Sequence, residues 1–422
     1  MKFILFRNFF ALSLLLAHAS VFSQHFMYQP GCASGKAYLH EDHNLSVKTY
    51  MNGGTSKKAY NSTGSKVELL NLYGNEQGAY AFHGVDLSPL TGNLLLLAQT
   101  LQTKDLTNKS ALYGATQVAG KITMFSAGMT FTRKVTEHFA MHVSLPVHHF
   151  SLKNVAINSL TPTAEMDGDF LAGRANLEAL LAAYKLHVRD VRDTTIGDIQ
   201  MFMSVHFTRE EDDTFGESSL SASVGVTLPT ARQRKLEEAF YIPMGNNGHV
   251  GFPISLDAKV LAHKYASFKV HAGTELFLKH DGMFRMKTDF KQNGFMKLAT
   301  GQAREKLGFK FDVNGGMCFH TESKEFGLSV AYRYEHQRAT TLTPFDTLNF
   351  DKTMVNSDDM LQKWDRHAIV VKVFHSPQWE NKDHDALCPH FNFSFTQPLK
   401  GKRILRTNVF GGAVGLDFSW NF

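Results

Sequence analysis

From Gly120 to its last residue the chain repeats one pattern, in which apolar and polar residues alternate over about 11–17 positions before a turn or loop. One such stretch, KITMFSAGMTFTRK, sets one face against the other: Phe125, Met129 and Phe131 against Ser126, Gly128 and Thr130. Successive side chains of a strand point to opposite faces, so a period of two predicts strands. These strands are about 11–15 residues long, whereas strands of soluble proteins average about 5–6. A soluble all-β fold is the alternative, and the length favours tilted strands that cross a bilayer.

The connections between these strands alternate in length along the chain. The short ones are Lys134–Glu137, Glu210–Glu217, His263–Ala266 and Thr321–Glu325. The long ones are Leu152–Thr194, Thr230–Gly248, His280–Ala303 and Ala339–Trp364. Membrane barrels have short turns at one rim and long loops at the other, so the alternation favours such a barrel over a soluble one.

The number of strands follows from counting back from the C-terminal strand. That count gives about eleven strands as far as Gly120, and an even number requires one more ascending strand before it. Asn93–Gln102 is the natural candidate for this strand, and Gly78–Val85 competes with it. We therefore predict an all-β fold, a closed antiparallel transmembrane β-barrel of about twelve strands, with ten or fourteen as the alternatives.

The first 23 residues have the pattern of a secretory signal peptide. Lys2 and Arg7 precede an apolar run, Phe9–Ala17, and small residues follow, so we expect cleavage after Ala19 or Ser23. The run is too short to cross a bilayer. Residues 24–88 fit the strand pattern poorly and are predicted to form an N-terminal segment in the periplasm or the lumen. Residues 89–422 are predicted to form the barrel.

One long loop carries a helical pattern within the sequence DFLAGRANLEALLAAYKLHV, residues 169–188. Its leucines recur at helical spacing, which predicts a helix there. This helix either enters the pore or covers the rim of the barrel, and the rim is the simpler expectation.

The polar faces of the predicted strands carry charges of both signs. Charge is costly in the apolar part of a bilayer, so these side chains must face the lumen. Ion pairs across neighbouring strands would fill a small barrel, which predicts a narrow or plugged channel instead of a wide porin. The predicted lumen-lining residues are Asp198, Asp257, Lys259, Lys269, Glu275, Lys310, Asp312, Arg333 and Glu335.

Composition narrows the function further. The net charge of +5 contains no basic block, so we expect no nucleic-acid partner. Cys32, Cys318 and Cys388 are an odd set and make no disulfide scaffold. The acidic or histidine-rich stretches at 40–43 and 167–169 lack metal-ligand spacing, and the chain has no phosphate-binding glycine loop. We therefore expect no metal and no cofactor.

The chain ends in GLDFSWNF, where Phe418, Trp420 and Phe422 alternate with polar residues. This ending resembles the C-terminal signature of bacterial outer-membrane β-barrel proteins. The resemblance implies a location in the bacterial outer membrane, lipid around the barrel, and recognition of the three aromatic residues by the barrel-assembly machinery.

A narrower resemblance covers IGDIQ and the later stretch SASVGVTLPTARQRK. These segments resemble barrels associated with the catabolism of aromatic compounds such as the phenol meta-pathway, with Ala231 replacing a glycine of the usual pattern. The resemblance implies passage of small, hydrophobic solutes. We expect a narrow channel or passive transporter for small solutes, with a structural or adhesion barrel without conduction as the alternative.

Enzymatic activity is the third possibility and is not expected. Outer-membrane phospholipase has a His and a Ser two positions apart on one strand, and His142 and Ser144 have this spacing. That enzyme's pair faces lipid, whereas the alternation here places His142 and Ser144 toward the lumen. Lining of a polar lumen explains the two residues better than catalysis does.

Overall fold

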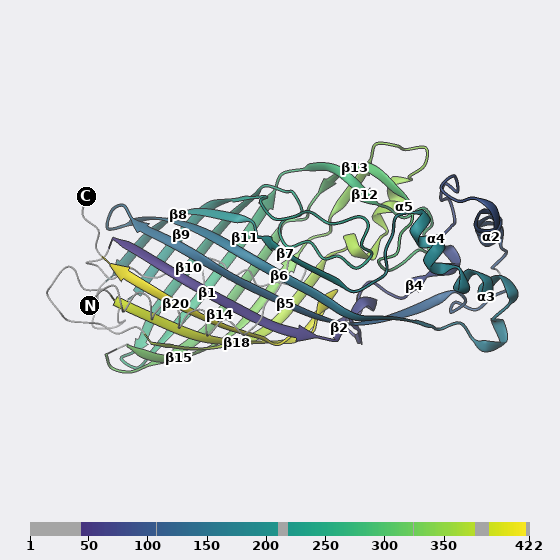
Figure 1. The fold of residues 1–422 in the computed structure, drawn as a ribbon. Coiled ribbons are helices and arrows are strands. Elements are labelled where there is room, and N and C mark those ends of the chain that lie inside the picture. The colour runs from purple at the N-terminus through teal and green to yellow at the C-terminus, as the bar shows by residue number, and fades with distance from the viewer. Residues whose placement is uncertain (1–43, 107, 210–217, 324, 376–387, 419–422) are drawn as a thin grey trace, which may run out of the picture.

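The computed structural model describes residues 44–106, 108–209, 218–323, 325–375 and 388–418. Within these residues an antiparallel sheet closes on itself as a barrel of twelve long strands (Figure 1). The predicted fold class is therefore confirmed, including the number of strands. The signal peptide predicted for residues 1–23 lies outside the described residues.

The barrel strands follow one another around the wall in chain order. They are β1 (Leu45–Ser56), β5 (Ala115–Lys134), β6 (Phe139–Ser159), β8 (Ile199–Arg209), β9 (Ser218–Leu228), β10 (Gly251–His263), β11 (Ala266–Phe277), β14 (Lys310–His320), β15 (Phe326–Gln337), β17 (Trp364–His375), β18 (Cys388–Lys402) and β20 (Val409–Phe418). β1 pairs with β5 on one side and β20 on the other, which completes the ring. Two short strands, β4 (Glu76–Gln77) and β7 (Val191–Ile196), lengthen the wall beside β5 and β6.

The twelfth strand is not the one expected. β1, Leu45–Ser56, fills that place, so the barrel begins well before residue 89 and residues 45–56 are not a separate N-terminal segment. Asn93–Gln102 lies in helix α2 (Gly92–Thr103), and Gly78–Val85 begins with the 3-10 helix η3 (Gly78–Tyr80). The run of four leucines in α2 packs partly against a core outside the barrel, which explains its apolar composition without a strand.

The two faces of the wall differ as the alternation predicts. On β8, Met201, Met203 and Phe207 are exposed on the outside, whereas Phe202 and Ser204 between them are buried. The other strands apart from β1 also carry exposed large apolar residues, which form a belt around the barrel. An apolar outer face with all strand edges paired is what a hydrocarbon environment requires.

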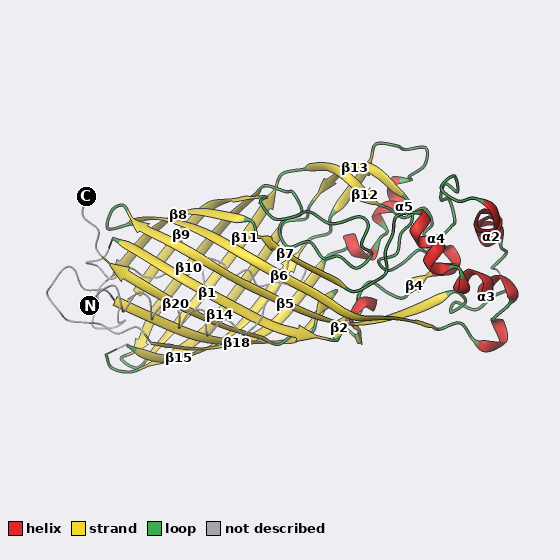
Figure 2. Cartoon of the chain, viewed as in Figure 1, coloured by secondary structure: helices red, strands yellow, loops and turns green. Residues whose placement is uncertain are grey.

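Short turns lie at the rim near the C-terminus, and long connections lie at the opposite rim (Figure 2). The connections at the far rim pack together into a compact unit, which we call the cap (residues 57–114, 160–190, 229–250, 278–309 and 338–363). The cap contains α2, α3 (Gly168–Ala175), α4 (Leu177–Ala183) and α5 (Lys352–Asn356), with the strands β2 (Lys58–Tyr60), β3 (Lys66–Glu68), β12 (His280–Arg285), β13 (Thr300–Lys306) and β16 (Thr341–Pro344). β2 also pairs with β19 (Ile404–Leu405), in the connection between β18 and β20.

The cap has a hydrophobic core of its own. Leu69 and Leu70, Phe240 and Tyr241, and Phe295 come from three different connections and are almost fully buried together. The helical pattern predicted at 169–188 is confirmed as α3 and α4, which pack in the cap beside α2 instead of entering the pore (Figure 1). No helix among the described residues has the length and apolar character needed to span a membrane.

Candidate functional site

All nine residues predicted to line the lumen lie on the inner side of the wall or at its rim. Eight of them are on strands β10, β11, β14 and β15, and Asp198 lies between β7 and β8. The structure joins six of them in direct ion pairs or through His271: Asp257, Glu275, Lys310, Asp312, Arg333 and Glu335. Whether they select solutes stays a prediction.

A continuous row of charges crosses five neighbouring strands of the wall. His271 lies between two carboxylates, 2.9 Å from Asp257 and 3.3 Å from Asp312. Arg333 continues the row, 3.3 Å from Asp312 and 3.0 Å from Glu335. Glu335 in turn lies 3.4 Å from Arg366 on β17. Because each charge is held by its neighbours, the row forms a fixed polar strip that narrows this side of the lumen.

A second part of the wall gathers positive charge. Lys259 and Lys269 are direct partners in the register of β10 and β11, and the ammonium group of Lys269 lies 6.0 Å from the ring centre of Phe374. Lys48 on β1 and Lys269 both lie close enough to Lys372 on β17 for their charges to interact with it. The lumen therefore has a mixed-charge side and a side rich in lysine.

Residues 229–250, which we call the inward loop, run from β9 to β10 and narrow the mouth of the barrel. Asp198 is buried, with 1% of its surface exposed, and holds both ends of this loop. Its carboxylate accepts hydrogen bonds from the backbone N–H of Ala231, at 3.0 Å, and from that of Asn246. Gly245 passes so close that an added Cβ would lie 2.6 Å from the Asp198 carboxylate.

The side chain of Asn246 connects the inward loop to the neighbouring strands β11 and β14. Its amide donates to Glu275 at 3.1 Å, and its carbonyl oxygen accepts from Lys310 at 3.1 Å. Glu275 also accepts from Thr227 and pairs with Lys310 at 3.4 Å. The loop, Asp198, Glu275 and Lys310 thus form one polar constriction at the mouth.

Asp193 on β7 anchors the base of the inward loop independently. Its carboxylate accepts from Arg232 at 2.6 Å and from the Tyr241 hydroxyl at 2.8 Å, and it lies 3.0 Å from the Lys235 ammonium. Burial raises the carboxyl pKa, but these donors outweigh it and hold the pKa of Asp193 below its usual range. The carboxylate therefore stays ionised, and the base of the loop stays tied to the wall.

Several residues of the constriction and of the polar strip were missed from sequence. Asn246 lies in a loop with no periodic pattern, so nothing in the sequence marks it. Arg366 and Lys372 lie on β17, where Ile369 to Val371 are apolar on both faces and hide the alternation. Only a more complete count of charges on this strand would have found them.

The other residues singled out from sequence have ordinary partners. His142 bonds to the hydroxyls of Thr132 at 2.8 Å and Ser204 at 2.7 Å on the inner face. The carboxylate of Asp167 caps α3 and pairs with Lys104 and Lys109. Cys318 is free and buried. Phe418 pairs with Leu45, whereas Trp420, Phe422, Cys32 and the stretch at 40–43 lie outside the described residues.

A buried carboxylate joins two connections of the cap. Glu76 on β4 accepts hydrogen bonds from the backbone N–H groups of Phe295, at 2.6 Å, and Met296, at 2.9 Å. Gly294 has a φ of +80°, and an added Cβ there would lie 2.3 Å from the Glu76 carboxyl group. Burial raises the pKa of Glu76 to about 7, although the two N–H donors oppose the rise.

The cap should therefore lose stability as the pH rises. Glu76 has a folded-state pKa of about 7 against an ordinary value of 4.5, so its contribution is complete below pH 4.5 and is lost as the pH passes 7. We expect a loss of about 2–3 kcal/mol over this window. The measurement is the rate of proteolysis within residues 278–309 in detergent as a function of pH. Glu76→Gln should flatten the profile, and an unchanged slope in that variant would contradict the assignment.

No family model matches the chain, and no curated protein matches it. Solved structures with similar folds include an outer membrane channel from Pseudomonas putida F1, with 9% identity, a TM-score of 0.49, and coverage of 89% of this chain and 96% of that one. A mutant of the monoaromatic hydrocarbon channel TodX shares 10% identity at a TM-score of 0.33, covering 90% of this chain and 91% of that one. The translocator domain of the autotransporter NalP from Neisseria meningitidis shares 9% sequence identity at a TM-score of 0.35, and the match covers 93% of each chain. Likenesses of this degree do not identify a function.

Proposed function

We propose that this chain is a narrow channel of the bacterial outer membrane through which small solutes pass passively. The apolar belt and the closed ring support a place in lipid, because the barrel strands pair all the way round and the charged groups of the polar strip face inward. The observation that carries the proposal is the constriction: a polar lumen whose mouth is narrowed by a loop held on Asp198, Glu275 and Lys310. A loop fastened inside the lumen by buried polar bonds controls passage, which a purely structural barrel does not need.

The test is single-channel recording in planar bilayers. The protein used is folded, as shown by a change in its gel mobility on heating. We expect steps of reproducible, small conductance, because the inward loop and the polar strip leave a narrow path. The control is the same preparation after heat denaturation, which should give no steps. A correctly folded barrel that inserts and stays silent would contradict the proposal.

The size of the cap favours a second function. Its core draws buried residues from most of the long connections, which is more than a constriction requires. A surface scaffold or adhesin would use such a unit as its working part and would conduct nothing. The silent barrel described above is the result that this second function predicts.

A further inference from the structure

A cavity of about 110 Å³ lies between the cap and the constriction. It is large enough for several waters or for one small organic molecule. Its walls come from the inward loop, from the connections around β12 and β13, and from residues 358–361, with Lys310 at its inner end. A solute that crosses the mouth would meet this cavity.

The acidic groups that line the cavity are already paired. Glu305 lies 2.9 Å from His249 and accepts from the Asn247 amide at 3.3 Å. Asp358 lies 2.7 Å from the ammonium group of Lys297. Neither carboxylate forms an ion pair with Arg234, although both attract its charge from a greater distance.

Arg234 of the inward loop also lines the cavity, and its guanidinium has no oxygen partner among the described residues. Its one contact there is with the sulfur of Met360 at 3.9 Å, which is a weak acceptor. Burial lowers the pKa of Arg234, and the negative charges of Asp358 and Glu305 and the phenol of Tyr73 oppose this shift. The guanidinium still stays charged at neutral pH. Arg234 is half-buried, and a guanidinium largely withdrawn from water without a hydrogen-bonding oxygen is costly unless something binds it.

Tyr73 presents a second unsatisfied group to the same cavity. The residue is 4% exposed, and within the described part of the chain its hydroxyl makes no hydrogen bond. Arg234 acts electrostatically on this phenol, and burial raises the pKa of Tyr73, so the hydroxyl is a neutral donor beside the guanidinium. The two groups together offer donors to one acceptor.

The surroundings add positive charge and apolar surface. Arg285 is half-buried and donates to backbone carbonyls, including those of Leu236 at 2.6 Å and Leu298 at 2.9 Å. Burial and the nearby charge of Arg234 lower the pKa of Arg285 to about 10, so both guanidiniums remain charged at neutral pH. Phe295 and Leu342 supply apolar lining. The cavity therefore suits a negative group attached to a small apolar body.

We propose that this cavity binds a small organic carboxylate, with Arg234 as its ion-pair partner and the Tyr73 hydroxyl as a second donor. This inference rests on the proposed function, because it names the class of solute that would bind behind the constriction during passage. Arginine recognises carboxylates through two parallel hydrogen bonds, which gives it an advantage over lysine at such a site.

The test is isothermal titration of the detergent-purified full chain with benzoate and, as the neutral probe of similar shape, benzyl alcohol. We expect benzoate to bind about ten- to a hundredfold more tightly than the alcohol, as a charge-assisted pair predicts. Arg234→Gln should remove this preference. Arg304→Gln is the matched control, since Arg304 is half exposed, pairs with Asp281 and does not line the cavity.

Two results would overturn the proposal: no binding of benzoate to the unaltered protein, or an unchanged preference in Arg234→Gln. If Arg234→Gln fails the heat-modifiability gel, Arg234→Lys keeps the charge and should weaken benzoate only in part, whereas Tyr73→Phe should weaken it by a few-fold. Binding in detergent does not depend on conduction. A barrel that binds benzoate but does not conduct would contradict the channel function and support the carboxylate site. A barrel that conducts but does not bind benzoate would support the channel function and contradict the site.

Discussion

Replacing Asp198 by alanine should raise the single-channel conductance by roughly two- to fivefold, because the inward loop leaves the mouth of the lumen. The carboxylate holds the backbone N–H groups of Ala231 and Asn246, and its removal leaves both without an acceptor. Each buried donor without a partner costs about 1–3 kcal/mol, which the loop avoids by moving into water. Asp193 still holds the base of the loop, so the variant should fold.

A second variant tests the same constriction sterically. Gly245→Val places a side chain where a Cβ would lie 2.2 Å from that of Ala231, so it should push the loop out and raise the conductance in the same way. Asp281→Ala is the control, because Asp281 forms an exposed ion pair with Arg304 on the outside of the cap. An unchanged conductance in both well-folded loop variants would show that the inward loop is not the constriction.

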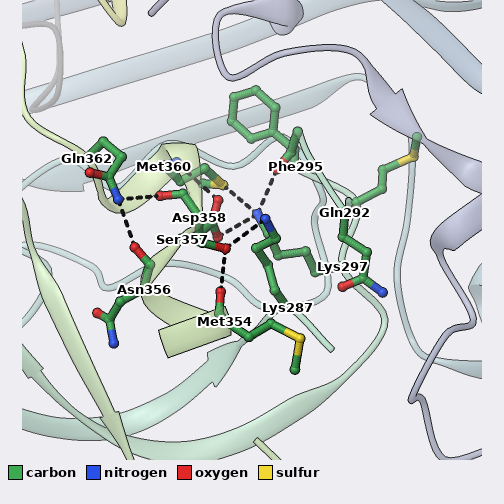
Figure 3. A network of polar contacts seen from close by, with 12 residues as sticks. Lys287, Gln292, Phe295, Lys297, Met354, Asn356, Ser357, Asp358, Met360 and Gln362 are labelled. Carbon is green, nitrogen blue, oxygen red and sulfur yellow. Dashed lines mark hydrogen bonds and ion pairs between the residues drawn. The ribbon is translucent and has the colours of Figure 1, made fainter. Parts of the chain in front are cut away.

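Replacing Asp358 by alanine should open the cap, with a loss of about 3–5 kcal/mol. Figure 3 shows the ammonium groups of Lys287 and Lys297 beside Ser357 and Asp358. Lys297 lies 2.7 Å from Asp358, and Lys287 donates to Ser357 at 3.1 Å and to the carbonyl of Phe290 at 2.9 Å. Both lysines are almost fully buried, at 1% and 2% exposed. Without Asp358 the two cations lose their shared counter-charge.

The measurement is hydrogen exchange or limited proteolysis of residues 278–309 and 338–363, because the barrel itself can stay intact. Asp359→Ala is the control: the side chains of Asp359 and its partner Arg403 are 22% and 13% exposed, so the loss should be smaller, at about 1–2 kcal/mol. The double variant Asp358→Leu with Lys297→Met should recover most of the stability, since it removes a charge of each sign. A cap as stable in Asp358→Ala as in Asp359→Ala would refute the role of the network.

The barrel was largely predictable because lipid imposes one rule on every strand. An outer face that meets hydrocarbon must be apolar, and an inner face that meets water is polar. The sequences of β8 and β14 therefore alternate with a period of two. β1 was not predicted as a strand, because its outer positions include Thr49, Gly53 and Thr55, which are weakly apolar or polar. The apolar run in α2 has no such period, and composition alone does not separate a strand from a helix there.

The candidate site was predictable only where it lies on the strands. The inward direction of Asp312, Arg333 and Glu335 follows from their positions in the alternating pattern, since a charge on a membrane strand is acceptable only on the side that faces the lumen. Arg234 and Asn246 lie on a loop whose course depends on contacts with Asp198 and Glu275, residues distant from it in sequence. Such contacts leave no local pattern, so neither the constriction nor the core of the cap was predictable from the chain alone.

The position of β1 between β5 and β20 has a consequence for biogenesis. The hydroxyl of Thr49 donates to the carbonyl of Val414, a contact between residues 365 positions apart. Contacts this distant in sequence form late and slowly during folding, because a long chain must first be ordered. The polypeptide therefore stays incompletely folded until nearly all of it has been delivered, and we expect it to depend on holding chaperones during that interval.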